Sequence, residues 1–236
     1  MLGRFLEFSV HAPDVPASLA VYELLGFVQA VTGDIRPYPY AVVTDGEVCI
    51  GLHAAPLAAP TLSFVRPELA RHLAELESRG VEPEVARLGE DAFHEVCFAD
   101  PAGQRVALLE ARTFSGTGLR GPASSRLGRF AGIVIPASNP ARSRAFWSAL
   151  GLSEFEPAGR GAWAGGLEGA GLRLALGAAP WRQAALAFVE PDWRRLADEL
   201  VRRCGLHRCA FRGGAEDSAL LTTPEGTALL LLPEAW

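Results

Sequence analysis

Two stretches decide the fold of this chain: GRFLEFSVHAPDVPASLAVYELLGF, residues 3–27, and GRFAGIVIPASNPARSRAFWSALGL, residues 128–152. They have the same length and the same opening Gly-Arg-Phe, and they are offset by 125 positions. Two further pairs of stretches match in the same order at offsets of 124 and 123, namely 62–80 with 186–205 and 100–111 with 223–234. A constant order at a nearly constant offset predicts a duplicated domain.

Each copy divides again into two units of the same plan. In the first unit, residues 5–11 are typical of a strand, and Asp14 is placed to cap a helix that has Pro16 in its first turn and Gly26 at its end. Three strands are then expected, near 27–32, 39–44 and 47–53. The chain is therefore predicted to be α+β, with four βαβββ units in two pairs.

The domain boundaries follow from the repeat and from composition. We expect a first domain over residues 1–112 and a second over 127–236. Residues 113–126 between them are rich in Gly, Ser and Pro, which is typical of a linker.

Charge and composition exclude several classes of partner. The 236 residues carry a net charge of −5 without a stripe of Lys and Arg, so we expect binding neither to nucleic acid nor to an anionic membrane. No apolar run reaches about 18 residues, the length of a membrane span. The start of the chain lacks the pattern of a signal peptide, and the four cysteines are scattered. A cytoplasmic protein with free thiols is the expectation.

The quoted stretches also resemble a known family. HAPDVPASLAVYELLGF, SNPARSRAFWSALGL and FADPAGQRVALLE are similar to segments of the vicinal oxygen chelate superfamily, which includes glyoxalase I, extradiol dioxygenases and bleomycin-binding proteins. The resemblance covers nearly the whole chain. It implies that paired units close into cup-shaped domains, and it implies no single activity.

In that superfamily a divalent metal is held at fixed positions of the cup. The resemblance places those positions on Glu7, Thr61, Ala107 and Ile50 in the first domain, and on Gly132, Ala185 and Leu230 in the second. Only Glu7 has a side chain suited to a catalytic metal, whereas such sites typically use three protein ligands. His11 is about 13 Å along the strand from Glu7, too far to share an ion. We therefore expect no metal cofactor, although a second chain could complete a site.

Alternation along the strands predicts a polar wall in the first cup. Ligand-binding candidates on that wall are Glu7, Ser9, His11, Thr61, Ser63, Glu95 and Arg105. Tyr38 is a further candidate, in a segment with Arg36 and Tyr40 that could clamp a planar or anionic ligand. An alternative is that Glu7 and Arg105 pair and fill the cup.

The same alternation gives a face to two other groups of residues. His53 and His94 have the opposite parity and are expected to face the helix layer or solvent. The wall of the second cup is expected to be small and apolar, comprising Gly132, Val134, Pro136, Ala185, Ala187, Val189, Ser218, Leu220, Ala228 and Leu230. This second cup could be packed shut, or could serve as a surface between domains or subunits.

Three functions are compatible with these features. The favoured one is a metal-independent protein that binds a small organic molecule in the cup of the first domain. An alternative is a lyase or dioxygenase-type enzyme that uses Glu7 as its base or as a single metal ligand. The third is a structural module that docks a partner through the second cup, and the fourfold repeat makes a homodimer plausible.

Overall fold

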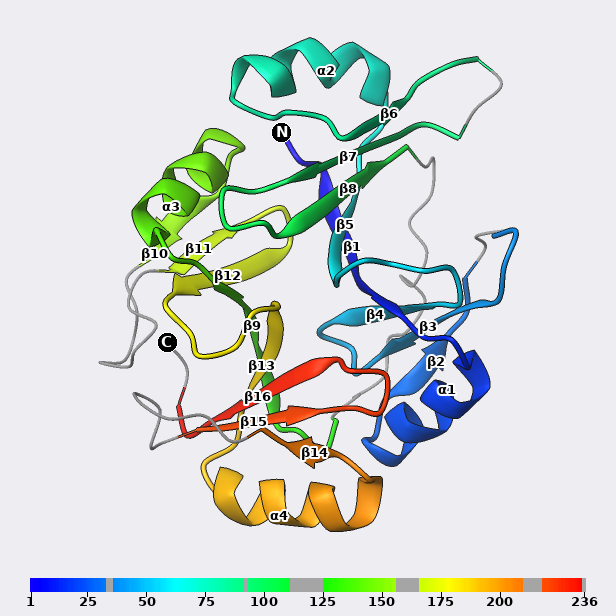
Figure 1. Ribbon diagram of the computed structural model, residues 1–236, viewed down its shortest axis with the longest axis vertical. Helices are drawn as coiled ribbons and strands as arrows, with labels where there is room; N and C mark the ends of the chain where they lie inside the picture. Colours follow the sequence, from blue (N-terminus) through cyan, green and yellow to red (C-terminus); the bar gives the residue numbers. More distant parts are fainter. Residues whose placement is uncertain (33–35, 91–92, 111–124, 156–165, 210–217, 235–236) are drawn as a thin grey trace.

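The chain folds into two similar α+β halves (Figure 1). The structure, a computed structural model, describes residues 1–32, 36–90, 93–110, 125–155, 166–209 and 218–234. The first half contains β1 (Arg4–His11), α1 (Val15–Leu24), β2 (Val28–Ala30), β3 (Tyr40–Thr44), β4 (Cys49–His53), β5 (Thr61–Val65), α2 (Leu69–Ser78), β6 (Val85–Arg87), β7 (Glu95–Ala99) and β8 (Arg105–Leu109).

The second half repeats this order. It contains β9 (Arg129–Pro136), α3 (Pro140–Ala149), β10 (Ser153–Phe155), β11 (Gly166–Gly169), β12 (Leu172–Gly177), β13 (Ala185–Val189), α4 (Trp193–Cys204), β14 (His207–Arg208), β15 (Ala219–Thr222) and β16 (Ala228–Leu232). The four predicted βαβββ units are thus confirmed. Most of the expected linker, residues 113–124, lies outside the described residues.

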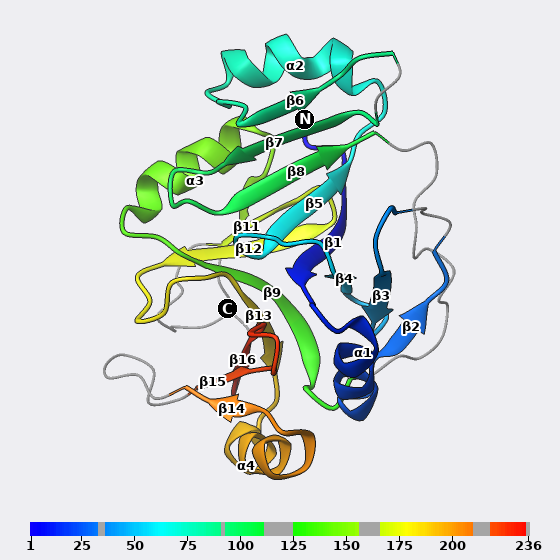
Figure 2. The same ribbon diagram turned by 45° about the vertical axis from the view of Figure 1, so that its right-hand side comes forward.

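Each half is built on one eight-stranded mixed sheet. The strand order is β2-β3-β4-β1-β5-β8-β7-β6 in the first sheet and β10-β11-β12-β9-β13-β16-β15-β14 in the second. The first strands of the two units in a half, such as β1 and β5, pair antiparallel at the centre, and each also runs parallel to the last strand of its own unit. The helices lie on the outside of the sheets (Figures 1 and 2). We call the opposite face of each sheet its cup.

Local sequence accounts for the repeated strand–helix junctions. The Asp14 carboxylate accepts the Ala17 N–H at the start of α1, as the sequence predicts, and Asn139 does the same for Arg142 at the start of α3. Gly3 and Gly128 precede the two long central strands with φ of +85° and +92°. At both sites an added Cβ would collide with a backbone carbonyl, so the duplication preserved the glycine for the same physical reason.

The halves share one hydrophobic core, which lies on the helix side of both sheets. Phe27 packs edge-on against Phe188 with ring centroids 6.4 Å apart, and Phe98 packs against Phe146 at 6.1 Å. No helix in the described part of the chain is long and apolar enough to cross a membrane.

Equivalent helices of the two halves insert an aromatic residue into the opposite half. Trp147 of α3 is fully buried, and its indole N–H donates to the Asp100 carboxylate at 2.9 Å, in the turn between β7 and β8. Tyr22 of α1, 125 positions earlier, is equally buried near Thr223 and Glu225 in the turn between β15 and β16. Burial and the neighbouring Glu225 raise the pKa of Tyr22 well above its ordinary value. The two contacts are related by the pseudo-symmetry of the duplication.

Candidate functional site

The cup of the first domain is centred on Glu7. This side chain projects from the middle of β1 and is only 1% exposed. Its Oε1 accepts a hydrogen bond from the Ser9 hydroxyl at 2.8 Å and pairs with His53 Nε2 at 2.8 Å, and its Oε2 accepts from the Tyr40 hydroxyl at 2.6 Å. A buried carboxylate needs such partners because an isolated charge is very costly away from water. We call Glu7, Ser9, His53, Tyr38 and Tyr40 the Glu7 network.

The prediction that His53 faces the helix layer or solvent is wrong. His53 lies in the cup, is 5% exposed and contacts Glu7. The prediction placed Ile50 on the cup face of β4, but Ile50 packs in the core on the helix side. Because alternate residues of a strand face opposite sides, this error also reversed the predicted face of His53. The register of the hairpin formed by β3 and β4 gives the correct face of His53. Tyr40 pairs directly with His53, and directly opposed residues of antiparallel strands share a face.

His53 links the buried carboxylate to the rim. Its Nδ1 lies 3.2 Å from the hydroxyl of Tyr38, which is half-buried. When Nε2 donates to Glu7, neutral His53 accepts from Tyr38 through Nδ1. The result is a continuous path from a buried anion through an imidazole to a phenol at the mouth of the cup.

Hydrogen bonding determines the charge state of Glu7. Burial alone would raise the pKa of this carboxyl, but the bonds from His53, Tyr40 and Ser9, together with the attraction to His53, hold its pKa below the ordinary value. Glu7 is therefore ionised at neutral pH. It can orient and stabilise a protonated imidazole, but it has no proton to donate.

A glycine makes room for the Glu7 carboxylate. An added Cβ at Gly51 of β4 would lie 2.2–2.5 Å from the three carboxylate atoms of Glu7. The side chain of Glu7 thus lies directly across Gly51 on its way to His53. The network depends on this missing side chain as much as on the polar groups themselves.

The network extends into the second unit of the same domain. The hydroxyls of Ser9 and Ser63 lie 2.8 Å apart, joining β1 to β5. Thr61, 7% exposed, bonds instead to the backbone oxygen of Ala59 at 3.3 Å. Of the sequence-predicted candidates, the structure thus joins Glu7, Ser9, Ser63 and Tyr38 in one hydrogen-bonded chain.

The remaining candidates are half-buried and lie outside the Glu7 network, and the alternative in which Glu7 pairs with Arg105 is wrong. Arg105 pairs with Glu84 at 2.9 Å, because Glu7 is already paired with His53 and Arg105 lies at the start of β8, opposite Thr61. Glu95 is paired with Arg87 at 3.4 Å and accepts from the Cys97 thiol. His11 is half-buried at the end of β1.

Two further groups bear on what the rim can do. Arg36 stacks over the rings of Tyr40 and Phe93, at 5.4 and 5.9 Å, and so places a cation beside the mouth. Burial and Glu95 raise the pKa of the Cys97 thiol to about 12, so this thiol is not a nucleophile at neutral pH.

His94 lies on the helix side, as the sequence predicts. It pairs with Glu110, which also accepts the Leu69 N–H at the start of α2.

The second cup is apolar and its floor is buried. Its cluster comprises Ala131, Val134, Ala175, Ala185, Ala187, Leu220, Ala228, Leu230 and Leu232, against which Phe155 and Trp181 pack. Val134, Ala187 and Leu230 are fully buried, so this floor is not available to solvent as a docking surface.

The metal implied by the fold family does not fit the first cup. Such a site typically needs three ligands from His, Glu, Asp or Cys. Within the described ranges no group of three such residues is placed to hold an ion. Glu7 and His53 are directed at one another, so neither Oε1 nor Nε2 presents a free ligand atom.

Comparisons with known proteins agree with the fold. No protein-family model and no curated protein sequence matches the chain. Solved structures do match it. A catechol 2,3-dioxygenase is 16% identical over 97% of this chain and 92% of its own, with a TM-score of 0.57. The 2,3-dioxygenase LapB from Pseudomonas sp. KL28 is 16% identical over 99% and 92%, with a TM-score of 0.62.

A Mn(II)-bound glyoxalase from Novosphingobium aromaticivorans is also similar, 15% identical over 97% of this chain and 81% of its own, with a TM-score of 0.58. The chain therefore has the two-domain fold of extradiol dioxygenases and glyoxalases, as the sequence resemblance predicts. At these identities the likeness establishes the fold and leaves the function to the residues of the cup.

Proposed function

We propose that this chain binds a small organic molecule in the cup of the first domain, without a metal ion. The single observation that carries the proposal is the Glu7 network: the one side chain suited to a metal at the family positions is paired with His53 and hydrogen-bonded to Ser9 and Tyr40. A ligand would be met by groups that are already oriented, which reduces the entropy cost of binding.

The ligand would contact the rim rather than Glu7 itself. Tyr38, Tyr40 and Arg36 supply two aromatic faces, a hydroxyl and a cation, whereas Glu7 is buried beneath them. A planar molecule matches this set if it carries an anionic or acceptor group for Arg36 and a hydrogen-bond donor for the Tyr38 oxygen, whose own proton is donated to His53. The network would hold the rim side chains in place from below.

Native mass spectrometry and metal analysis of the purified, untagged chain test the metal-free part of the proposal. We expect no stoichiometric divalent ion and a retained organic mass, or else a hit in a ligand screen read by thermal shift. About one equivalent of a divalent ion per chain would contradict the proposal.

A matched pair of substitutions tests the location. Tyr38→Phe removes the rim hydroxyl and should weaken a ligand by about tenfold, the effect of one hydrogen bond. Tyr22→Phe makes the same change in the interior and should leave the affinity unchanged. Equal affinities for both variants would place the ligand elsewhere.

A second candidate is a proton-transfer enzyme, favoured by the path from Glu7 through His53 to Tyr38. A carboxylate that orients an imidazole is a recurrent arrangement of general acid–base catalysis. Here His53 Nδ1 would take the Tyr38 hydroxyl proton as the phenol oxygen takes a proton from the substrate, and Glu7 would stabilise the imidazolium. An isomerisation could use this relay, because the phenol would return the proton to another carbon of the substrate as His53 returns its own proton to the phenol.

Glu7→Gln distinguishes the two candidates. In a binding protein it should shift affinity moderately, because the rim groups remain. In an enzyme it should abolish turnover while the substrate still binds, because Gln cannot stabilise the protonated imidazole by charge.

A further inference from the structure

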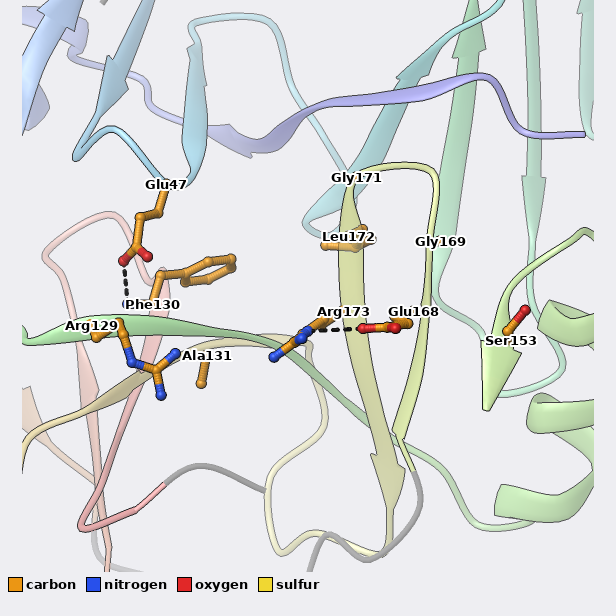
Figure 3. A pocket seen from close by; sticks show the side chains of 10 residues that line it. All are labelled: Glu47, Arg129, Phe130, Ala131, Ser153, Glu168, Gly169, Gly171, Leu172 and Arg173. Atoms are coloured by element: carbon orange, nitrogen blue, oxygen red, sulfur yellow. Dashed lines mark hydrogen bonds and ion pairs between the residues drawn. The ribbon is translucent and has the colours of Figure 1, made fainter. Parts of the chain in front are cut away.

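A cavity separate from the first cup lies between the two halves of the chain (Figure 3). Its volume is about 670 Å³, within the range of small-molecule sites. Glu47, from the turn between β3 and β4, is the contribution of the first half. The second half supplies residues 129–131 of β9, Ser153, and part of the hairpin formed by β11 and β12. None of these residues belongs to the Glu7 network.

Hydrogen bonds between the halves fix the walls of this cavity. The Glu47 carboxylate accepts the Phe130 N–H at 2.8 Å. At the tip of the β11–β12 hairpin, the Ala170 carbonyl accepts the Phe5 N–H at 2.6 Å. Because each bond joins one half to the other, the cavity is held open by the domain contact itself.

Two arginines converge on the cavity. Figure 3 shows Arg129 of β9 and Arg173 of β12 pointing toward one another across Ala131. Glu168, which pairs with Arg173 at 3.2 Å, lies on the side of Arg173 away from Arg129. In the part of the chain that the structure describes, Arg129 has no ion-pair partner, and the nearby Glu47 carboxylate is used by the Phe130 backbone. Glu168 offsets the charge of Arg173, so an anion between the two arginines would supply the counterion that Arg129 lacks among the described residues.

The residue between the two arginines is apolar. Ala131, 6% exposed, lies on their side of the sheet and belongs to the apolar cluster of the second cup, whereas Leu172, 5% exposed, and half-buried Phe130 pack with the shared core on the other side. Guanidinium groups bind carboxylates and phosphates through paired N–H donors, whereas an apolar residue beside them suits a hydrocarbon or an aromatic ring.

We propose that this interdomain cavity binds a small organic anion. Arg129 and Arg173 receive its carboxylate or phosphate group, and Ala131, which lies between them, contacts its apolar part. The proposal is independent of the first cup, since the two sites share no residue.

Calorimetric titration of the full chain with phenyl phosphate, benzoate and inorganic phosphate tests this site. We expect phenyl phosphate or benzoate to bind more tightly than inorganic phosphate. Arg129→Gln and Arg173→Gln should each weaken that binding by about tenfold, the loss of one charge-assisted contact. Arg129→Lys should weaken it less, because the charge remains.

Two control variants show whether the probes bind in this cavity. Arg202→Gln removes another exposed arginine, from α4 and outside the cavity, and should leave the affinity unchanged. Tyr22→Phe alters the interior, away from both proposed sites, and should also have no effect. The proposal is overturned if no probe binds at millimolar concentration or if the cavity variants bind as the wild type does. A loss in Arg202→Gln or in Tyr22→Phe equal to theirs would overturn it as well.

Discussion

The two cups are formed by equivalent strands, but their central residues are opposite in kind. Glu7 at the centre of the first cup corresponds to Gly132 in the second, and Gly51, over which Glu7 lies, corresponds to Ala175. The larger residue therefore lies on the first strand in one cup and on the last strand in the other. A polar centre required space on the neighbouring strand, and where that centre was absent an alanine fills the position.

Gly51→Ala should have the largest effect, because it breaks this complementarity directly. The new methyl group would overlap the Glu7 carboxylate and force it away from His53, leaving buried polar groups unpaired. We expect a loss of about 3 kcal/mol in the free energy of unfolding, measured by urea denaturation. Ala175→Gly in the second cup is the matched control and should cost about 1 kcal/mol. Similar losses in the two variants would show that the cups do not differ in this respect.

Trp147→Phe tests a second pair of equivalent regions, the aromatic residues that α3 and α1 insert into the opposite half. It removes the donor to the buried Asp100 carboxylate and part of a fully buried ring, so we expect a loss of about 2.5 kcal/mol in a denaturant titration. A loss below about 0.5 kcal/mol would mean that the indole hydrogen bond does not hold the halves together.

Glu7→Gln should cost less, about 1.5 kcal/mol at neutral pH, since the amide keeps the shape and one acceptor oxygen. The pKa of Glu7 is lowered in the folded chain, so its contribution is complete above the pKa of the unfolded chain and is lost as pH falls through the lower folded value. The difference in the free energy of unfolding between the wild type and Glu7→Gln should therefore disappear below about pH 4. Thermal unfolding of both proteins at several pH values measures this difference. A difference that persists in acid would contradict the conclusion that Glu7 is ionised at neutral pH.

Tyr22→Phe should have the smallest effect. The buried Tyr22 hydroxyl makes no hydrogen bond with the residues that the structure describes, unlike the indole of Trp147. Removing it should change the free energy of unfolding by no more than about 0.5 kcal/mol, and could stabilise the chain. A loss as large as that of Trp147→Phe would show that the two halves of the interface are equivalent after all.

The fold was predictable from the sequence because its signals are local and occur twice. The N-cap at Asp14, the glycine that ends α1 and the turn before β8 are each short-range features, and the duplication repeats them at a fixed offset. Strand alternation likewise placed Glu7, Ser9 and Ser63 on one face, where the structure brings them together.

The partners within the cup were not predictable in the same way. A pair of Glu7 with Arg105 was one alternative because the two share a predicted face, but sharing a face does not say which side chain is close enough. His53 was missed because its face depends on the register of a hairpin, in which one residue of error reverses the assignment. Glu84, the actual partner of Arg105, lies outside the regular strands and carries no periodic signal.

The crossed insertion of Tyr22 and Trp147 has a consequence for how the chain could have diverged. In a symmetric pair of identical subunits, every substitution appears on both sides of the interface at once. Here the two halves are encoded separately, so an indole bonded to a carboxylate on one side can coexist with a phenol near a threonine on the other. The same freedom let one cup keep a charged centre while its twin became a packed apolar interior.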